Sequence, residues 1–365
     1  MKLLIRVDAS TRIGSGHVMR CLTVARKLKK KQVKVAFCCR PLEGHLIEFI
    51  AEEFPVHELM PAEVNLSETD ESKWLGVPQK QDASETLKFI RQGGYDAVLV
   101  DHYAIDSTWE SEIKREAKLL TVIDDLANRP HDADILVDQT LGRRQADYQA
   151  YVSDETTLLC GTAYGLLRDE FLICRENNKT RIPRVSVQRI LITFGGADID
   201  NLTEQAIEGL KKSGRYLSAQ VEVILGIGNP HSSEIKGALD SLKQETQLCV
   251  GVADMSMRMM NADVCIGAAG STSWERCVLG LPAIVTAQAT NQQLIAYQLS
   301  KAGAAKLVSR SSLVDDIAEA LKELDEDSEL LLNMSSKAAT LCDGRGAERV
   351  STIMLNGKRK HDETY

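Results

Sequence analysis

Residues 3–21 read LLIRVDASTRIGSGHVMRC, and this stretch decides the class of fold. Its first five residues form a mostly apolar run of the kind found in buried strands, and residues 18–30 have the spacing of an amphipathic helix. Gly14 and Gly16 lie between the two. A strand, a glycine-rich turn and a helix in this order are typical of an open parallel sheet, which binds its ligands at the carboxyl ends of the strands.

The same alternation of short apolar runs and helical patterns continues along the chain. The strand-like runs of the first half span residues 3–7, 33–39, 97–100, 119–123, 135–137 and 157–160. Those of the second half span residues 190–194, 221–225, 248–250, 264–266, 283–286 and 305–308. Strands that alternate with helices form mainly parallel sheets with helices on both faces. The two series therefore predict two doubly wound α/β domains.

The length of the chain and one polar segment predict the domain boundaries. A chain of 365 residues is too long for one hydrophobic core and suits two domains. Residues 176–187 are polar, basic and interrupted by a proline, as is typical of a linker. The predicted domains are therefore residues 1–175 and 188–355. Residues 356–365 are strongly charged, and we expect them to form a frayed polar tail.

Composition argues against several classes of function. Hydrophobic residues make up 44% of the chain and charged residues 26%, as in ordinary globular proteins. The net charge of -8 gives no electrostatic support to a nucleic-acid partner. No apolar run is long enough to cross a membrane, the N-terminal run does not resemble a signal peptide, and the nine cysteines include no C-x-x-C pair. We expect a cytoplasmic protein with reduced thiols and no stable membrane association.

Gly14, Ser15, Gly16 and His17 form the turn between the first strand and the first helix. A dinucleotide-binding fingerprint needs a third glycine where this chain has Met19, and no P-loop sequence occurs either. The turn alone could be a glycine-rich connection with His17 as a solvated helix cap. An imidazole is also the side chain best suited to proton transfer near neutral pH, so His17 is a candidate catalytic base.

A second glycine-rich turn, IGAAGSTSWE over residues 266–275, follows a strand and opens another helix. Small residues let an anion approach the backbone, whose free N–H groups bind it at the start of the helix. Hydroxyls here can donate to phosphate, and a carboxylate one turn later can accept from sugar hydroxyls. Helix capping would explain part of the pattern, but three hydroxyls after Gly-Ala-Ala-Gly exceed what a cap requires. The candidate binding residues are Gly270, Ser271, Thr272, Ser273 and Glu275.

Two further features extend this pattern. Gly195 and Gly196 follow the first strand of the second domain and permit a ligand to approach the backbone closely. Asn291 lies at the start of a helix after the strand-like run 283–286, where an asparagine commonly caps the helix. Chain order nevertheless places Asn291 at the same edge of the sheet as the phosphate turn.

Acidic and histidine residues follow several strands of the first half, as DHY at 101–103, DD at 124–125 and HDAD at 131–134. The D-x-D pair makes a metal conceivable, but no ligand spacing such as H-E-x-x-H supports one. Strand-end carboxylates that face a sugar ring, or that cap turns, are the favoured interpretation. Asp101 and Tyr103 are therefore candidate substrate-binding residues, and we expect no metal.

Together these motifs resemble a known family. The segments RVDASTRIGSGHVMRCL, VDHYAID, IDDLANRPHD, GTAYGLLRDEF, FGGADIDNLT and AAGSTSWERC occur in this order over roughly residues 1–350. They are similar to those of the UDP-sugar hydrolases of pseudaminic acid biosynthesis, the PseG family. That family is related to the MurG-like glycosyltransferases. The resemblance therefore implies the GT-B fold, in which two Rossmann-like domains flank an interdomain cleft.

The resemblance also implies a reaction, the hydrolysis of UDP-2,4-diacetamido-2,4,6-trideoxy-β-L-altropyranose at its anomeric C–O bond. The products are UDP and the free sugar, with inversion at the anomeric carbon. The family's general base corresponds to His17, which Asp8 could orient, and its nucleotide site corresponds to residues 267–275 of the second domain. Asn291 is the second catalytic candidate. No cofactor is required, and proteins with this fold are commonly monomers.

Two weaker assignments come from the Y-G-L-L-R segment of the family, and they fall on Tyr164 and Arg168 as substrate-binding residues. The family more often has proline where this chain has Asp169, a difference that we expect to be harmless.

Three other functions stay open at this point. An inverting glycosyltransferase of the same fold would use His17 to activate an acceptor hydroxyl instead of water, and fold alone cannot separate the two. The sequence favours hydrolysis modestly, because the N-terminal domain has no apolar or basic patch that would suit a lipid acceptor. The remaining alternatives are a hydrolase of a related nucleotide-sugar and a nucleotide-sugar sensor without activity.

Overall fold

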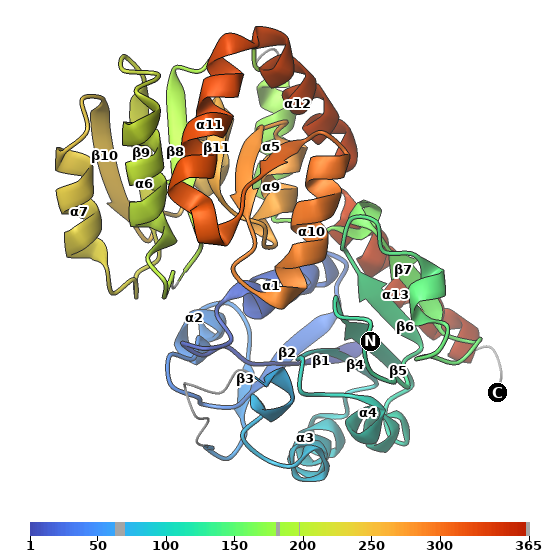
Figure 1. The fold of residues 1–365 in the computed structure, drawn as a ribbon. Helices are drawn as coiled ribbons and strands as arrows, with labels where there is room; N and C mark the ends of the chain where they lie inside the picture. The colour runs from blue at the N-terminus through green and yellow to red at the C-terminus, as the bar shows by residue number, and fades with distance from the viewer. Residues whose placement is uncertain (63–69, 180–182, 197, 363–365) are drawn as a thin grey trace. The chain divides into compact units, whose positions relative to one another are not determined.

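The first strand of the chain, β1 (Lys2–Val7), lies inside a seven-stranded sheet with the strand order β3-β2-β1-β4-β5-β6-β7 (Figure 1). Every neighbouring pair in this sheet is parallel. The computed structural model describes residues 1–62, 70–179, 183–196 and 198–362. The other strands of the sheet are β2 (Lys34–Cys39), β3 (Val56–Glu58), β4 (Ala97–Asp101), β5 (Leu119–Ile123), β6 (Ile135–Asp138) and β7 (Thr157–Cys160).

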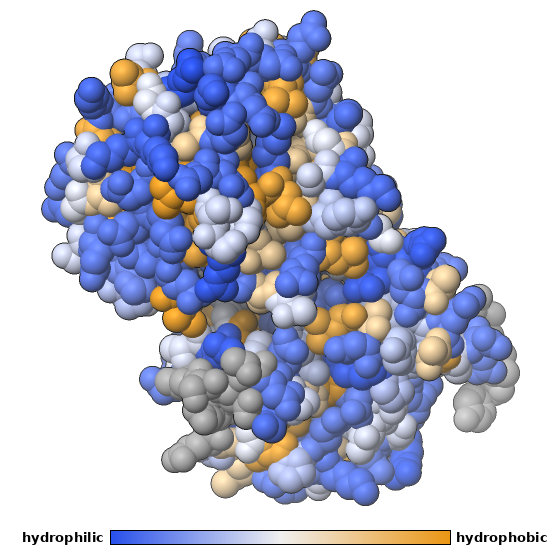
Figure 2. All heavy atoms as spheres, in the orientation of Figure 1, coloured by the Kyte–Doolittle hydropathy of each residue, from blue (hydrophilic) through white to orange (hydrophobic). Residues whose placement is uncertain are grey.

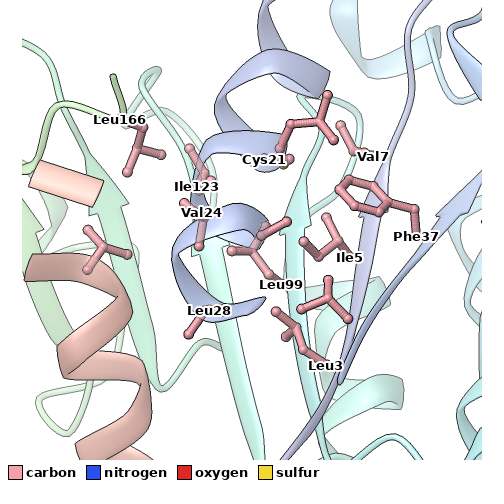
Figure 3. Packing of buried hydrophobic residues seen from close by; sticks show 14 of the residues in the cluster. Leu3, Ile5, Val7, Cys21, Val24, Leu28, Phe37, Leu99, Ile123 and Leu166 are labelled. Atoms are coloured by element: carbon pink, nitrogen blue, oxygen red, sulfur yellow. The ribbon is translucent and has the colours of Figure 1, made fainter. Parts of the chain in front are cut away.

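Strand β1 is buried on both faces, which explains why its sequence is an almost continuous apolar run. Leu3, Ile5 and Val7 belong to the core on one face, with Val24 and Leu28 of α1 (Gly16–Lys30) (Figure 3). Helix α13 (Gly346–Asp362) adds apolar residues to the same core. Leu4 belongs to the core on the other face, with Trp109 of α4. The helices of this unit are α1 (Gly16–Lys30), α2 (Ile47–Ala51), α3 (Gln79–Gly93), α4 (Ser107–Lys114) and α13 (Gly346–Asp362).

A second sheet has the order β10-β9-β8-β11-β12-β13, again with parallel neighbours. Its strands are β8 (Arg189–Thr193), β9 (Gln220–Leu225), β10 (Glu245–Val250), β11 (Val264–Ala268), β12 (Ala283–Thr286) and β13 (Ala305–Leu307). Its helices are α5 (Asp169–Asn177), α6 (Leu202–Ser213), α7 (Ser232–Asp240), α8 (Met255–Asn261), α9 (Thr272–Val278), α10 (Thr290–Lys301), α11 (Leu313–Glu326) and α12 (Ser328–Leu341).

Each sheet is wound outward from an inner strand. β1 has β2 on one side and β4 on the other, and β8 is flanked in the same way by β9 and β11. The connections leave such a strand in opposite directions, so the carboxyl ends there leave room for a ligand. The predicted pair of doubly wound α/β sheets is confirmed. The first sheet has one strand more than predicted, β3, whose three residues are not buried and include one apolar side chain, Val56.

The two compact units divide the chain differently from the predicted domains. One unit consists of residues 1–167 together with the segment from residue 345 onward, and the other consists of residues 168–344. Helix α5 therefore belongs to the second unit. Helix α13 returns to the first unit, because its apolar residues are buried in the core beneath α1, namely Ala347, Val350 and Met354.

The predicted linker and tail are also more ordered than their charge suggested. Residues 180–182 lie outside the described part of the chain. Arg184 is buried, and its guanidinium donates to the carbonyl oxygens of Ala262, Leu279 and Met260. This basic side chain binds the carbonyl ends of helices instead of facing solvent. The predicted tail is helical as far as Asp362, and residues 363–365 are not described.

The described residues contain no helix with both the length and the apolar character needed to span a bilayer. On the face drawn in Figure 2, hydrophilic residues predominate and hydrophobic residues form small separate groups. All nine cysteines are free thiols, and most of them are buried.

Candidate active site

His17 occupies the second position of α1, directly after the glycine-rich turn. The turn is closed by a hydrogen bond from Gly14 N to Ser10 O (2.8 Å), and Ser10 Oγ accepts from Ile13 N (2.9 Å). Gly14 has a φ of 77°, which explains the glycine at this position. His17 itself is buried, with 7% of its surface exposed. It is therefore not the solvated helix cap that the sequence left open.

The partner of His17 is Asp101, the last residue of β4. Because β1 and β4 are parallel neighbours, with Val7 opposite Asp101, their carboxyl ends lie side by side. His17 Nδ1 lies 2.6 Å from Asp101 Oδ1. The carboxylate accepts the Nδ1 proton, which fixes the tautomer and leaves the Nε2 lone pair free to take a proton. This is the form that a general base needs.

Arg20, one turn after His17 on α1, holds Asp101 in its charged form. Its Nε lies 2.5 Å from Asp101 Oδ2 and its Nη2 lies 2.6 Å from Oδ1. Burial alone would raise the pKa of Asp101, but Arg20 and His17 hold that pKa well below its usual range. Arg20 Nη2 also lies 3.2 Å from His17 Nδ1. Since Nδ1 cannot donate and accept at once, we assign the shorter contact, with Asp101, as its hydrogen bond.

Tyr103 completes a closed ring of contacts around His17. Its ring meets the imidazole edge-on, with centroids 4.6 Å apart. Its hydroxyl faces Asp125, and Arg20 Nη1 lies 2.8 Å from Asp125 Oδ2. Burial, followed by the charge of Asp125, raises the pKa of Tyr103 well above its usual range. The ring runs from His17 through Asp101, Arg20, Asp125 and Tyr103, so Asp101 and Tyr103 are themselves held beside the imidazole.

Asp8 is not the residue that orients His17. Its carboxylate accepts from Arg6 Nη1 (2.6 Å) and Nη2 (2.8 Å), and from the backbone N–H of Arg40 (2.7 Å). Arg6 also binds Asp82, so Asp8 belongs to a separate buried network behind the turn. The sequence placed Asp8 near His17 because both follow β1, whereas the neighbouring strand β4 supplies the carboxylate.

Asp124 and His131 belong to contacts other than those of His17, and His131 Nε2 lies 3.8 Å from Asp124 Oδ2. Asp124 binds Arg129 (2.6 Å) and the Tyr148 hydroxyl (2.8 Å). His131 Nδ1 lies 2.7 Å from Glu110 Oε1. Within the part of the chain that the structure describes, no three histidine, cysteine or acidic side chains come together in a group that could hold a metal. Asp124 Oδ2 also accepts from the backbone N–H of Ala127 at 2.9 Å, so this carboxylate caps the turn that follows β5.

Two glycine-rich turns lie side by side at the carboxyl edge of the second sheet. Gly267 in β11 pairs with Thr193 in β8, so the segments that follow these strands are neighbours. A Cβ atom on Gly267 would lie 2.1 Å from Thr193 O, so the two strands approach too closely for any side chain there. Gly195, with a φ of 88°, and Gly196 are both exposed after β8. The two turns therefore present backbone at one common edge.

The hydroxyls of the second turn point in different directions. Ser271 is exposed and Thr272 is half-buried. Ser273 is buried, and its Oγ accepts from Arg276 Nη2 at 2.9 Å. Of the three hydroxyls, those of Ser271 and Thr272 are the ones left toward solvent. Gly270 lies beside the first turn of α10, because a Cβ atom there would come within 3.5 Å of Gln292 Nε2.

Glu275 is half-buried in α9 and faces Arg168, with 3.3 Å between Oε1 and Nη2. Arg168 Nη1 also lies 3.0 Å from Glu170 Oε1. Burial raises the pKa of Glu275, and Arg168 acts in the opposite direction. The structure thus brings together two residues that the sequence assigned to substrate separately, and their separation of 107 residues carries no signal of the pair.

Asn291 and Tyr164 complete the predicted set. Asn291 is the second residue of α10, whose cap position is Ala289, so it is not the N-cap. Parallel pairing of β11 with β12 puts the start of α10 beside the second turn, as chain order predicted. Tyr164 lies in the first unit, in a short 3₁₀ helix (Thr162–Tyr164), and packs against the core.

Comparison with solved structures decides the fold. MurG of Acinetobacter baumannii superposes with a TM-score of 0.67 at 16% identity, over 97% of this chain and 99% of that chain. UDP-GlcNAc 2-epimerase of Neisseria meningitidis superposes with a TM-score of 0.66 at 15% identity, over 98% of this chain and all of that chain. This chain has the GT-B fold.

Sequence comparisons agree with the GT-B assignment. Residues 189–350 match the glycosyltransferase family 28 C-terminal domain. The chain is 28% identical over 306 residues to UDP-2,4-diacetamido-2,4,6-trideoxy-beta-L-altropyranose hydrolase of Campylobacter jejuni, over 83% of this chain and 97% of that protein. It is 22% identical to the spore coat polysaccharide biosynthesis protein SpsG of Bacillus subtilis, over 97% of this GT-B chain and 98% of that one. The resemblance that the motifs predicted is confirmed.

Proposed function

We propose that this protein hydrolyses UDP-2,4-diacetamido-2,4,6-trideoxy-β-L-altropyranose at the anomeric C–O bond, with inversion, and releases UDP and the free sugar. The observation that carries the proposal is the contact between His17 and Asp101. A buried, charged carboxylate holds Nδ1–H and leaves Nε2 as a proton acceptor at the end of β1, where sheets of this type bind ligands.

In the proposed reaction, a water oxygen attacks the anomeric carbon while His17 Nε2 takes its proton. The anomeric C–O bond breaks, and its electron pair leaves with UDP. Asp101 then stabilises the imidazolium that forms. UDP is a good leaving group, so a general acid is less necessary than for an ordinary glycoside. One proton is gained by His17 and later returned to solvent, so the enzyme ends each cycle unchanged.

The second unit is proposed to bind UDP. The backbone of the two glycine-rich turns, with the hydroxyls of Ser271 and Thr272, would accept the diphosphate. Glu275 would accept hydrogen bonds from the ribose hydroxyls, and Arg168 fixes its carboxylate. Tyr103 would contact the sugar beside the imidazole. Asn291, at the start of α10, is the second proposed catalytic residue. In support, a relative with the hydrolase name matches 83% of this chain over 97% of its own length.

A glycosyltransferase is the second candidate. The match of residues 189–350 to a glycosyltransferase domain favours it, as does the structural likeness to MurG. In that reaction His17 would deprotonate the hydroxyl of an acceptor in place of water, with the same geometry around the imidazole.

One experiment separates these functions. The purified protein is incubated with the UDP-sugar in H₂¹⁸O without any acceptor, and products are followed by NMR and mass spectrometry. Hydrolysis at the C–O bond predicts UDP without label and a free sugar that first appears as the inverted anomer with ¹⁸O at its anomeric hydroxyl. Label in the phosphate of UDP would contradict C–O cleavage. Release of UDP only after an acceptor is added would establish the transferase instead.

A further inference from the structure

Arg276, in α9, is a buried cation that makes no direct ion pair with a described carboxylate, and Glu275 attracts it only at longer range. It is 2% exposed. Its Nη2 donates to Ala268 O and to Ser273 Oγ, both at 2.9 Å, while its Nη1 is buried and has no hydrogen-bond partner. Among the residues that the structure describes, no carboxylate lies within ion-pair distance of Arg276. A buried charge in this state costs free energy unless something else compensates it.

The other fully buried arginines are compensated. Arg6 binds the carboxylates of Asp8 and Asp82. Arg40 shares Asp82 and also faces Glu85. Arg184 donates through Nε, Nη1 and Nη2 to backbone carbonyls. Arg276 differs from these three arginines because it has neither an ion pair within the described residues nor a partner for its Nη1 group.

The position of Arg276 suggests a role for this charge. A Cβ atom on Gly267 would lie 3.7 Å from Arg276 Nη1 and 2.1 Å from Thr193 O, so the guanidinium lies against the ends of β8 and β11. The chain continues from these ends into the two glycine-rich turns, at Gly195 and at Gly270. The guanidinium of Arg276 thus lies directly beneath the edge at which both turns present their backbone.

We propose that Arg276 is the buried positive charge of an anion site formed by these two turns, and that the anion is the diphosphate of the bound nucleotide. The identity of the anion rests on the proposed function. The charge comes from a side chain held by the turn itself, through Ala268 O and Ser273 Oγ, and not from the short helix α9. Protein and not water separates the guanidinium from the surface of the turns. The attraction between the guanidinium and an anion bound there is therefore weakly screened.

The test compares UDP with uridine, which lacks the phosphates, by isothermal titration calorimetry on the full chain. Arg276→Met should weaken UDP binding about tenfold or more, which corresponds to one unpaired charge interaction of about 1.4 kcal/mol. It should leave uridine binding within about twofold of the wild type. Arg276→Lys keeps the charge and should keep the affinity for UDP within about threefold.

Arg175→Met is the matched control. Arg175 donates through Nη1 to the carbonyl oxygens of Val278, Ala339 and Cys342, at the opposite end of α9 from Ser273. This variant loses the same charge and a similar set of hydrogen bonds. It should unfold at a lower temperature but keep the wild-type ratio of UDP to uridine affinity.

Three results would overturn the inference while leaving the proposed function intact. These are an unchanged affinity ratio in Arg276→Met, an equal loss for UDP and uridine, and a loss in Arg276→Lys as large as in Arg276→Met. If Arg276→Met does not fold, the lysine variant and Arg276→Gln decide between charge and packing in the same way. A wild-type protein that does not bind UDP would instead overturn the proposed function, and the diphosphate assignment with it.

Discussion

His17 Nδ1 lies 2.6 Å from Asp101 Oδ1, although 84 residues separate the two in the chain. The contact exists because β1 and β4 are parallel neighbours that end at the same level, one before the glycine-rich turn and the other at the carboxylate itself. The sheet thus joins a histidine on a helix to an aspartate on a strand.

Replacing His17 removes the proposed base but none of the contacts proposed for UDP. His17→Ala should lower kcat about 10²–10⁴-fold, the usual contribution of general-base catalysis, and should leave the Kd for UDP unchanged. Exogenous imidazole should restore part of the activity, because it can enter the space left by the side chain. Near-normal turnover in His17→Ala would show that another group deprotonates the water.

Replacing Asp101 should leave the imidazole in place but no longer fixed in the productive tautomer. Asp101→Asn is expected to lower kcat about a hundredfold or more with little change in KM, since an amide can donate to Nδ1 and shift the proton to Nε2. Asp82→Asn is the matched control, because Asp82 is also buried and binds two arginines, Arg6 and Arg40. It should cost stability but not kcat. Equal losses of kcat in the two variants would reduce Asp101 to a structural role.

Glu275 should distinguish ribose from deoxyribose. Glu275→Gln is expected to weaken UDP binding about tenfold, the cost of weakening a charged hydrogen bond, with a smaller change in kcat. The same variant should bind 2′,3′-dideoxy-UDP as the wild type does, because that ligand has no hydroxyls to offer. Calorimetry with both nucleotides measures the difference. An equal loss for the two ligands would mean that Glu275 supports the turn through Arg168 and does not touch the ribose.

Asp138 should make stability depend on pH. Burial, and then the charge of Asp125, raises the pKa of Asp138 to about 6. The Tyr148 hydroxyl lies 2.8 Å from both Asp124 Oδ2 and Asp138 Oδ2, and its single hydrogen can serve one of them. If one of the two carboxyl groups is protonated, both short contacts of Tyr148 can be hydrogen bonds. The raised pKa of Asp138 makes Asp138 the group that carries this proton.

The sign follows from proton binding. The folded state holds this proton more tightly than the unfolded state, so the contribution to stability is complete below about pH 4 and is lost as pH rises through about 6. The full change is of the order of 3 kcal/mol. Urea unfolding at pH 4.5 and pH 7.5 should show that wild type loses more stability between these values than Asp138→Asn. A constant difference between the two proteins would contradict the assignment of the proton.

The sequence predicted the sheets well because both faces of parallel strands are buried, as the run from Leu3 to Val7 illustrates. It also located both glycine-rich turns and His17, which are local features. It could not predict the partner of His17, because that depends on which strands are neighbours, and it chose Asp8 by proximity in the chain. His17 and Arg20 are three residues apart on α1 and so lie on one face of the helix. This spacing could have indicated that Arg20 belongs to the same group of contacts. No feature of the sequence near Arg168 or Glu275 indicated that these two residues are partners.

Because α13 belongs to the first unit, it determines the order in which the two units can finish folding during synthesis. Residues 168–344 are complete as a unit before the ribosome has made α13, whereas the core beneath α1 lacks Val350 and Met354 until then. The second unit can therefore fold first, although it is encoded later than most of the first. Until the last helix emerges, the nascent N-terminal sheet exposes the apolar surface beside α1 that Val350 and Met354 later cover.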